Sequence, residues 1–199
     1  MKQIDKLTEP PSDKINFILK LQICGMLEKA NVEINTLIEY FPKSWKLYNL
    51  SGAINFGLSI FDKSILSFIK SFKINPNSEQ SYINLGGTLL NLDEINTAIL
   101  YFKKALKINS KNSKAFNNLG LALQKKGEFN KAKSCFLKAI KIQPNYTDCY
   151  FNLGILFNLT NNFRKSIEYY KKAIFYKPNY VEAYYNMGLV LQKYNKDKE

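Results

Sequence analysis

The sequence predicts an all-α fold, a right-handed superhelical solenoid of stacked antiparallel helix pairs. Three observations lead to this fold class. The 199-residue chain repeats itself with a period of 34 residues, apolar residues recur within each repeat at steps of three and four, and glycine and proline recur at fixed places. A period of this length is typical of helical repeats that bury their apolar faces against one another. We therefore expect a stack of helix pairs.

Small and aromatic residues recur at defined places of the repeat. The repeats begin at Trp45, Glu79, Ser113, Thr147 and Val181. Their eighth place is Gly52, Gly86, Gly120, Gly154 and Gly188. The twentieth place is Ser64, Ala98, Ala132 and Ser166, and the twenty-fourth is Phe68, Phe102, Phe136 and Tyr170. Small side chains let two antiparallel helices approach closely, and the aromatic rings fill the space between neighbouring units.

The repeat divides the chain into segments, which we take in order. Residues 1–10 are predicted to be a flexible leader, and residues 11–44 a degenerate repeat that has Ile18 where the glycine should stand. The complete repeats are 45–78, 79–112, 113–146 and 147–180, and residues 181–199 form a partial repeat with a first helix only. We expect helices at 13–25, 28–40, 45–57, 62–74, 79–91, 95–108, 113–126, 129–142, 147–159, 163–176 and 181–194. Prolines such as Pro144 and Pro178 end the second helices.

These columns resemble the tetratricopeptide repeat family. The resemblance covers almost the whole chain after the first ten residues. It implies that the first helix of each pair lines a concave groove and that the protein serves as a scaffold for protein–protein interaction. This function is an expectation that follows from the family.

The sequence offers no set of residues for catalysis. The chain has no histidine, which removes the commonest general base and metal ligand. No glycine-rich phosphate loop is present, since Asn84–Gly87 lacks the lysine and the glycine spacing of a Walker motif. The cysteines Cys24, Cys135 and Cys149 have no Cys-x-x-Cys spacing, and we interpret them as small buried side chains. We therefore expect a protein that is not an enzyme and uses no cofactor or metal.

The formal net charge of +13 does not by itself indicate a nucleic-acid ligand. The positive charge is nearly all lysine, and the only arginine is Arg164, whereas base recognition favours arginine. Lysines also recur on the second helices, where they indicate a solvated outer face or, as the alternative, a surface for an acidic partner. No apolar run reaches the length of about 18 residues that a membrane span needs. We expect a cytoplasmic protein without nucleic acid as its partner.

Asparagine recurs at the sixth place of the first helices. The column is Asn84, Asn118, Asn152 and Asn186. A primary amide has two donors and an acceptor, so a row of amides can bind a peptide backbone of any sequence. Duplication of a repeat also copies asparagines, so hydrogen bonding within the solenoid remains the alternative. Asn117, which precedes Asn118, is predicted to belong to no such row.

Other side chains of the predicted groove complete the candidate site. Lys114 stands at the second place, Phe151 and Tyr185 at the fifth, and Ile155 and Leu189 at the ninth. The asparagine row is similar to that of the repeat region of O-linked N-acetylglucosamine transferases, and this resemblance implies that it holds a substrate polypeptide. The repeats also resemble those of chaperone-binding proteins, and this resemblance implies a clamp of lysine and asparagine side chains for a terminal carboxylate. Of the basic residues that such a clamp needs, this chain has only Lys114. Towards the C-terminus the groove becomes apolar and aromatic.

The last segment has apolar residues on more than one face of its helix. They are Tyr184, Met187, Leu189, Val190, Leu191 and Tyr194. Exposed apolar patches often mark an interaction site. Three interpretations stay open: self-association through this helix, docking of a partner, and descent from a longer protein.

We therefore predict a non-catalytic interaction scaffold. Its concave groove would bind an extended or helical segment of a partner protein. The alternative is the substrate-selecting repeat region of a glycosyltransferase or another transferase whose catalytic part is missing or encoded separately.

Overall fold

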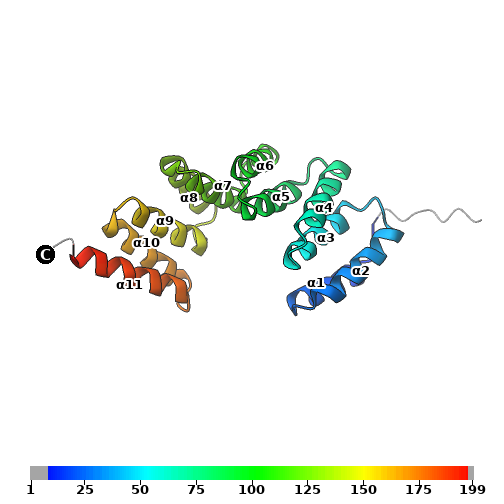
Figure 1. Ribbon diagram of the computed structural model, residues 1–199, viewed down its shortest axis with the longest axis horizontal. Helices are drawn as coiled ribbons and strands as arrows, with labels where there is room; N and C mark the ends of the chain where they lie inside the picture. Colours follow the sequence, from blue (N-terminus) through cyan, green and yellow to red (C-terminus); the bar gives the residue numbers. More distant parts are fainter. Residues whose placement is uncertain (1–8, 197–199) are drawn as a thin grey trace, which may run out of the picture. The chain divides into compact units, whose positions relative to one another are not determined.

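The chain folds into helices joined by short turns (Figure 1). The structure is a computed structural model and describes residues 9–196, in which there are eleven α-helices and no strand. The helices are α1 (Ser12–Ile23), α2 (Leu27–Tyr40), α3 (Trp45–Gly57), α4 (Phe61–Ile74), α5 (Glu79–Asn91), α6 (Ile95–Ile108), α7 (Ser113–Lys125), α8 (Phe129–Ile142), α9 (Thr147–Leu159), α10 (Phe163–Tyr176) and α11 (Val181–Lys196). The predicted all-α fold class is confirmed. Residues 1–8 of the predicted leader lie outside the described residues.

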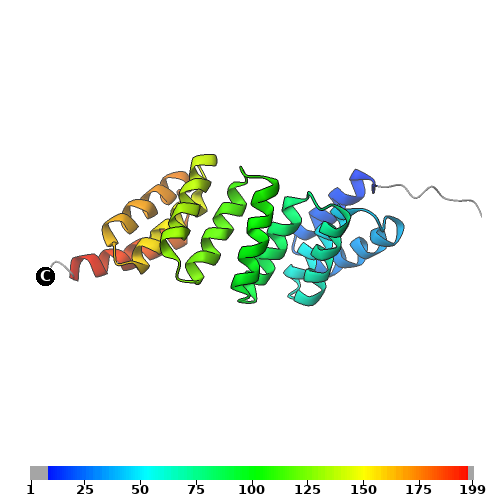
Figure 2. The same ribbon diagram turned by 90° about the horizontal axis from the view of Figure 1, so that it is seen from above.

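The helices form two compact units, residues 1–108 and 109–199. In the first unit each of α1, α3 and α5 packs on the helix that follows it, and in the second unit α7 and α9 do the same. Successive pairs also touch within a unit, because α2 packs on α3, α4 on α5, α8 on α9 and α10 on α11. Figure 2 shows the helices of each unit lying side by side.

Each turn inside a helix pair uses one residue with positive φ at the fifteenth place of the repeat. Glycine fills this place twice, as Gly25 (φ 72°) and Gly127 (φ 82°). Ser59, Asp93 and Asn161 fill it in the other pairs with φ between 55° and 62°. Asn and Asp tolerate this left-handed conformation better than most residues with a side chain. The turn geometry is therefore kept throughout, although glycine is not.

The eighth-place glycines lie against the twenty-fourth-place rings of the same repeat. A Cβ atom on Gly120 would lie 2.5 Å from Cε1 of Phe136, and one on Gly154 would lie 2.5 Å from Cε1 of Tyr170. Gly52 and Gly86 have the same relation to Phe68 and Phe102. These rings are almost completely buried, so they have little room to move. The glycine is therefore required by the close approach of the ring.

Serine at the twentieth place bonds the backbone at these glycines. Ser64 Oγ donates to the carbonyl oxygen of Gly52 (2.9 Å), and Ser166 Oγ donates to that of Gly154 (2.7 Å). Both serines are fully buried, so the bonds satisfy hydroxyl groups that have no access to water. Where serine rather than alanine stands in this column, its hydroxyl group is therefore paired.

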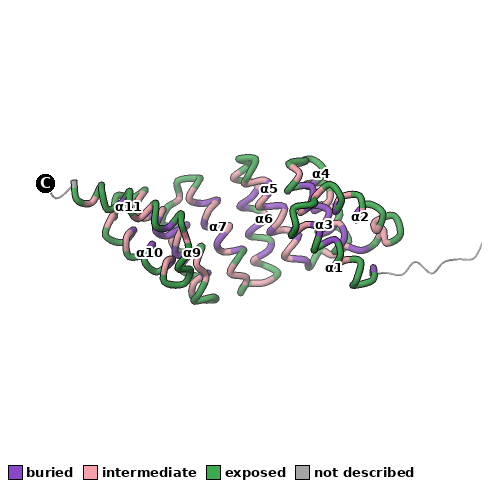
Figure 3. The backbone as a smooth tube through the Cα atoms, turned by 90° about the horizontal axis from the view of Figure 1, so that it is seen from below, coloured by how far each residue is buried: buried purple, intermediate pink, exposed green. Residues whose placement is uncertain are grey.

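The core of each unit runs along the helix pairs (Figure 3). In the first unit it contains Ile18, Leu47 and Ile54, all at most 1% exposed. The prediction for the cysteines holds for Cys135 and Cys149, which are buried, and is wrong for Cys24, which is exposed. Cys24 directly follows the last residue of α1 and begins the turn that leads into α2.

Candidate functional site

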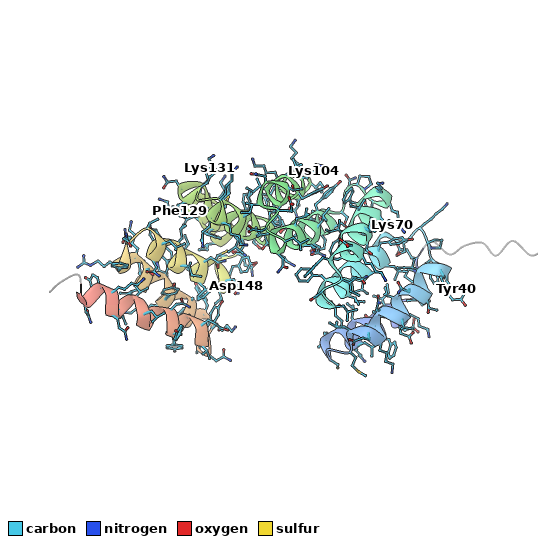
Figure 4. All side chains as sticks on the ribbon, viewed as in Figure 1. Tyr40, Lys70, Lys104, Phe129, Lys131 and Asp148 are labelled. Carbon is cyan, nitrogen blue, oxygen red and sulfur yellow. The ribbon has the colours of Figure 1, made fainter. Side chains whose placement is uncertain are left out.

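The first helices of successive repeats touch one another and form a continuous surface in the second unit, and in the first unit α3 touches α5. In the second unit α7 contacts α9, and α9 contacts α11. We call the side chains of the second, fifth, sixth and ninth places on these three helices the first-helix face. Asp148, at the second place of α9, lies on the opposite side of the unit from Lys131 and Phe129 of α8 (Figure 4). All predicted groove residues except Asn84 belong to this face, since Asn84 lies in the first unit.

Asn84 on α5 takes part in a chain of hydrogen bonds within the first unit. Its Oδ1 accepts from Gln80 Nε2 at 2.7 Å, and its Nδ2 donates to Oδ1 of Asn49 on α3 at 3.1 Å. The second bond joins the sixth place of one repeat to the fifth place of the repeat before it. The amide of Asn84 therefore links two neighbouring first helices.

Asn152 on α9 makes the same link in the second unit. Its Nδ2 donates to Oδ1 of Asn117 on α7 at 2.8 Å, and the Cys149 thiol lies 3.3 Å from the same oxygen as a second donor. Asn117 is 5% exposed and Asn152 is 7% exposed. Burial raises the pKa of the Cys149 thiol to about 12, and the charge of Asp148 adds to the shift. The thiol is therefore protonated at neutral pH and remains a donor.

The other two asparagines of the row have no such link. Asn118 is half-buried and accepts a long hydrogen bond of 3.4 Å from Asn117 Nδ2, while its own Nδ2 donates to no group in the described part of the chain. Asn186 is half-buried, and its Nδ2 donates to the carbonyl oxygen of Glu182 on its own helix at 2.7 Å. Asn118 therefore has donors to offer to a ligand.

The row separates into these two classes because of the fifth place. Hydrogen bonds form where this place is Asn, as in Asn49 and Asn117. The residues 35 positions before Asn118 and Asn186 are Ile83 and Phe151, which have no amide. The prediction that Asn117 belongs to no row missed this, because it compared residues at a spacing of 34. A search at 35 would have found both pairs.

The C-terminal part of the first-helix face is apolar and aromatic. Phe151 is half-buried, and its ring centroid lies 5.0 Å from that of Tyr180 and 5.7 Å from that of Tyr170. Ile155 is half-buried. Tyr185 and Leu189 on α11 are 67% and 41% exposed. The face therefore offers an apolar surface that is in part accessible to a ligand.

Charges on the face differ between its helices. Lys114 at the start of α7 is exposed and positive, whereas Asp148 and Glu182 at the starts of α9 and α11 are exposed and negative. Burial, together with the charges of Asp148 and Glu182, raises the pKa of Tyr180 to about 12. A ligand across α7, α9 and α11 therefore meets a positive group first and two negative groups after it.

The described residues contain no group of three or more histidine, cysteine, aspartate or glutamate side chains that could hold a metal ion. Among the same residues, no helix has both the length and the apolar character needed to cross a membrane. The groups assembled on the first-helix face are amides, a lysine, two carboxylates and apolar side chains, which are suited to noncovalent binding.

Family models of the tetratricopeptide repeat (TPR) match the second half of the chain and part of the first. The matched segments are residues 79–112, 113–146, 135–168 and 156–194. Together they span more than half of the 199 residues. No curated protein matches the sequence.

Several solved structures share the fold. YrrB, described as a TPR protein with an unusual peptide-binding site, is 22% identical with a TM-score of 0.66, and the match covers 92% of this chain and 93% of that chain. PilF of Pseudomonas aeruginosa is 16% identical with a TM-score of 0.80, covering 94% and 85%. TTC0263, a TPR protein of Thermus thermophilus, is 14% identical with a TM-score of 0.80, covering 91% and 98%. The repeat matches and these likenesses in fold agree, and the chain belongs to the tetratricopeptide repeat family.

Proposed function

We propose that this protein is a non-catalytic interaction scaffold whose second unit binds an extended segment of a partner protein on the first-helix face. The observation that carries the proposal is the split of the asparagine row. Asn152 is buried and bonded to Asn117, whereas Asn118 on the adjacent helix keeps two donors that no group of the described chain uses. A half-buried amide whose donors are unused can donate to the backbone carbonyl of a peptide.

The other residues of the first-helix face indicate which side chains a bound partner segment would have. Its apolar side chains would lie against Phe151, Ile155 and Leu189, and an acidic group would lie near Lys114. Basic groups would suit the end near Asp148, which is labelled in Figure 4, and Glu182. The peptide-binding site named for YrrB supports the general mode, since that protein shares the fold. The first-helix face suits the same mode because its first helices are continuous within the unit.

A peptide library displayed on phage tests the proposal with the full chain. Peptides selected on the natural protein are measured against a variant with Lys114→Ala and Asn118→Ala. We expect their affinity to fall by about 1–3 kcal/mol, because a charged group and an amide lose their hydrogen bonds with the ligand. The matched control carries Asn130→Ala and Lys141→Ala, the same residue types exposed on α8, and should bind as the natural protein does.

Two results would contradict the proposal. Selected peptides that bind the Lys114 and Asn118 variant with unchanged affinity would exclude this face. A selection that yields only peptides sensitive to the α8 control would place binding on the second helices. Self-association through α11 stays a separate prediction, and sedimentation of the same samples measures it.

A further inference from the structure

The first unit contains an open polar pocket that the proposed peptide face does not include. It has a volume of about 320 Å³ and lies between α2, α3 and α4. The lining residues are Asn31, Asn35, Ile38, Tyr48, Ser51, Asn55, Lys63, Leu66, Ser67 and Lys70. This volume is near the lower end of the range for small-molecule sites, about 300–1,000 Å³.

The pocket exists because polar and small residues replace apolar ones in a single repeat. Ser51 stands where the three later complete repeats have Leu85, Leu119 and Leu153. Asn55 stands where they have Leu89, Leu123 and Phe157, and Ser67 where they have Tyr101, Cys135 and Tyr169. All three substituted positions line the pocket. The repeat at 45–78 has therefore lost the side chains that fill this space elsewhere.

Asn55 is one of the substituted positions in the pocket wall. It is 3% exposed, and its Nδ2 donates to the carbonyl oxygen of Ser51 at 2.9 Å. A carbonyl oxygen only accepts, so this bond fixes the orientation of the amide and leaves Oδ1 as the other atom. Oδ1 is buried and has no hydrogen-bond partner. Asn55 is therefore held in one orientation and forms a polar part of the pocket wall.

The repeat at 147–180 shows what the same space can hold. There the Phe157 ring stacks on the Tyr169 ring, with centroids 5.3 Å apart and planes 10° apart. The ammonium of Lys165 lies 5.5 Å from the centroid of Phe157. In the pocket the corresponding residues are Asn55, Ser67 and Lys63. A planar ring thus fits the space that the two missing rings leave, with Lys63 in the position of the covering lysine.

The lining also defines the charge of the ligand. Lys63 and Lys70 are both exposed at the pocket, and none of its lining residues is acidic. Lys70 lies on α4 (Figure 4), with its ammonium 5.4 Å from the centroid of the Tyr48 ring. Asn31, Asn35, Ser51 and Ser67 add amide and hydroxyl groups. Two ammonium groups without a carboxylate favour an anionic group on the ligand.

We infer that this pocket binds a small planar carboxylate, with the ring between α2, α3 and α4 and the carboxylate at Lys63 and Lys70. The inference concerns the first unit and is independent of peptide binding by the second. Leu66 and Ile38 supply apolar contacts to the ring.

Benzoate is the probe, and chemical shifts of the full chain in NMR are the measurement. We expect saturable shifts in the backbone amides of α2, α3 and α4. Benzyl alcohol, which has the ring but no charge, should bind at least about tenfold more weakly, because it loses hydrogen bonds between charged groups. Ser67→Tyr introduces the ring that two of the later repeats have, Tyr101 and Tyr169, and should abolish the shifts. Asn55→Leu should do the same from the opposite wall.

The charge is tested by a variant with Lys63→Met and Lys70→Met, for which we expect a loss of affinity of about tenfold or more. Its matched control carries Lys73→Met and Lys107→Met, two exposed lysines of the same unit that do not line the pocket. The control should bind benzoate as the natural chain does. An equal loss in both lysine variants would overturn the inference, as would shifts that survive both Ser67→Tyr and Asn55→Leu.

Discussion

At the scale of single residues, the glycine of the repeat is determined by one aromatic ring. Gly52, Gly86, Gly120 and Gly154 each lie against the ring at the twenty-fourth place of their own repeat. Gly188 stands in the same column, but nothing lies within 4 Å of the position where its Cβ would be. The described chain has no second helix after α11, so no such ring is present there. One column thus contains glycines with opposite tolerance to substitution.

This difference predicts opposite effects of the same mutation. Gly120→Ala should lower the free energy of unfolding by about 1–3 kcal/mol, because the new methyl group overlaps the buried Phe136 ring. Gly188→Ala should leave it unchanged or raise it by about 0.5–1 kcal/mol, since alanine favours the helix. Urea denaturation followed by circular dichroism measures both. A loss of stability in Gly188→Ala as large as in Gly120→Ala would contradict the assignment.

Many of these features of single residues could be predicted from the sequence. The period predicted the glycine column and the helix α5 at residues 79–91. It also predicted why glycine recurs, namely that a neighbouring helix lies too close for a side chain. Its ring partner was not identified, because a column records where a residue recurs and not what it touches. The pairing of Asn117 with Asn152 also escaped, since the hydrogen bond joins different places of adjacent repeats, 35 residues apart. A comparison of residues at the same place in each repeat does not find such contacts.

At the scale of helices, paired asparagines join neighbouring first helices. Asn49 bonds Asn84 between α3 and α5, and Asn117 bonds Asn152 between α7 and α9. The two alternatives for the asparagine row, ligand binding and bonding within the solenoid, therefore apply to different members. Bonding within the solenoid accounts for Asn84 and Asn152, and ligand binding stays the proposal for Asn118.

A double-mutant cycle on α7 and α9 measures the buried pair. Asn117→Leu should cost about 1–3 kcal/mol of unfolding free energy, because it leaves the buried Asn152 amide without its acceptor. Adding Asn152→Leu to Asn117→Leu should recover part of this loss, since only the weak thiol donor of Cys149 then remains without its acceptor. Asn118→Ala is the control and should change stability little. Simple additivity of the two single changes would show that the amides do not interact.

At the scale of the whole molecule, the second unit contains four tyrosines that are wholly or partly buried. In the second unit burial raises the pKa values of Tyr146, Tyr150, Tyr170 and Tyr180 to about 12, from an ordinary value of 10.0. Burial is the largest cause for each of them. The Tyr150 hydroxyl also donates to the carbonyl oxygen of Pro144 at 2.8 Å, a bond that its ionised form cannot make.

These tyrosines predict a loss of stability at alkaline pH. Each folded-state pKa lies above the unfolded one, so the folded unit holds its protons more tightly, and its stability is complete below pH 10. The free energy of unfolding should then fall as the pH rises from 10 towards 12. Urea titrations at several pH values, with tyrosinate absorbance as the second probe, measure the effect. Tyr150→Phe should make the decline shallower, and stability independent of pH over this window would refute the prediction.

The asparagine pairs also limit how the number of repeats can change during evolution. At the fifth place asparagine alternates with apolar residues, as Asn49, Ile83, Asn117 and Phe151. An in-frame deletion of residues 113–146 would remove Asn117 and leave Asn152 beside Ile83, with its amide unpaired. A deletion of residues 79–112 would keep Asn117 and Asn152 together. The gene therefore tolerates the gain or loss of two repeats at once more easily than that of an arbitrary single repeat.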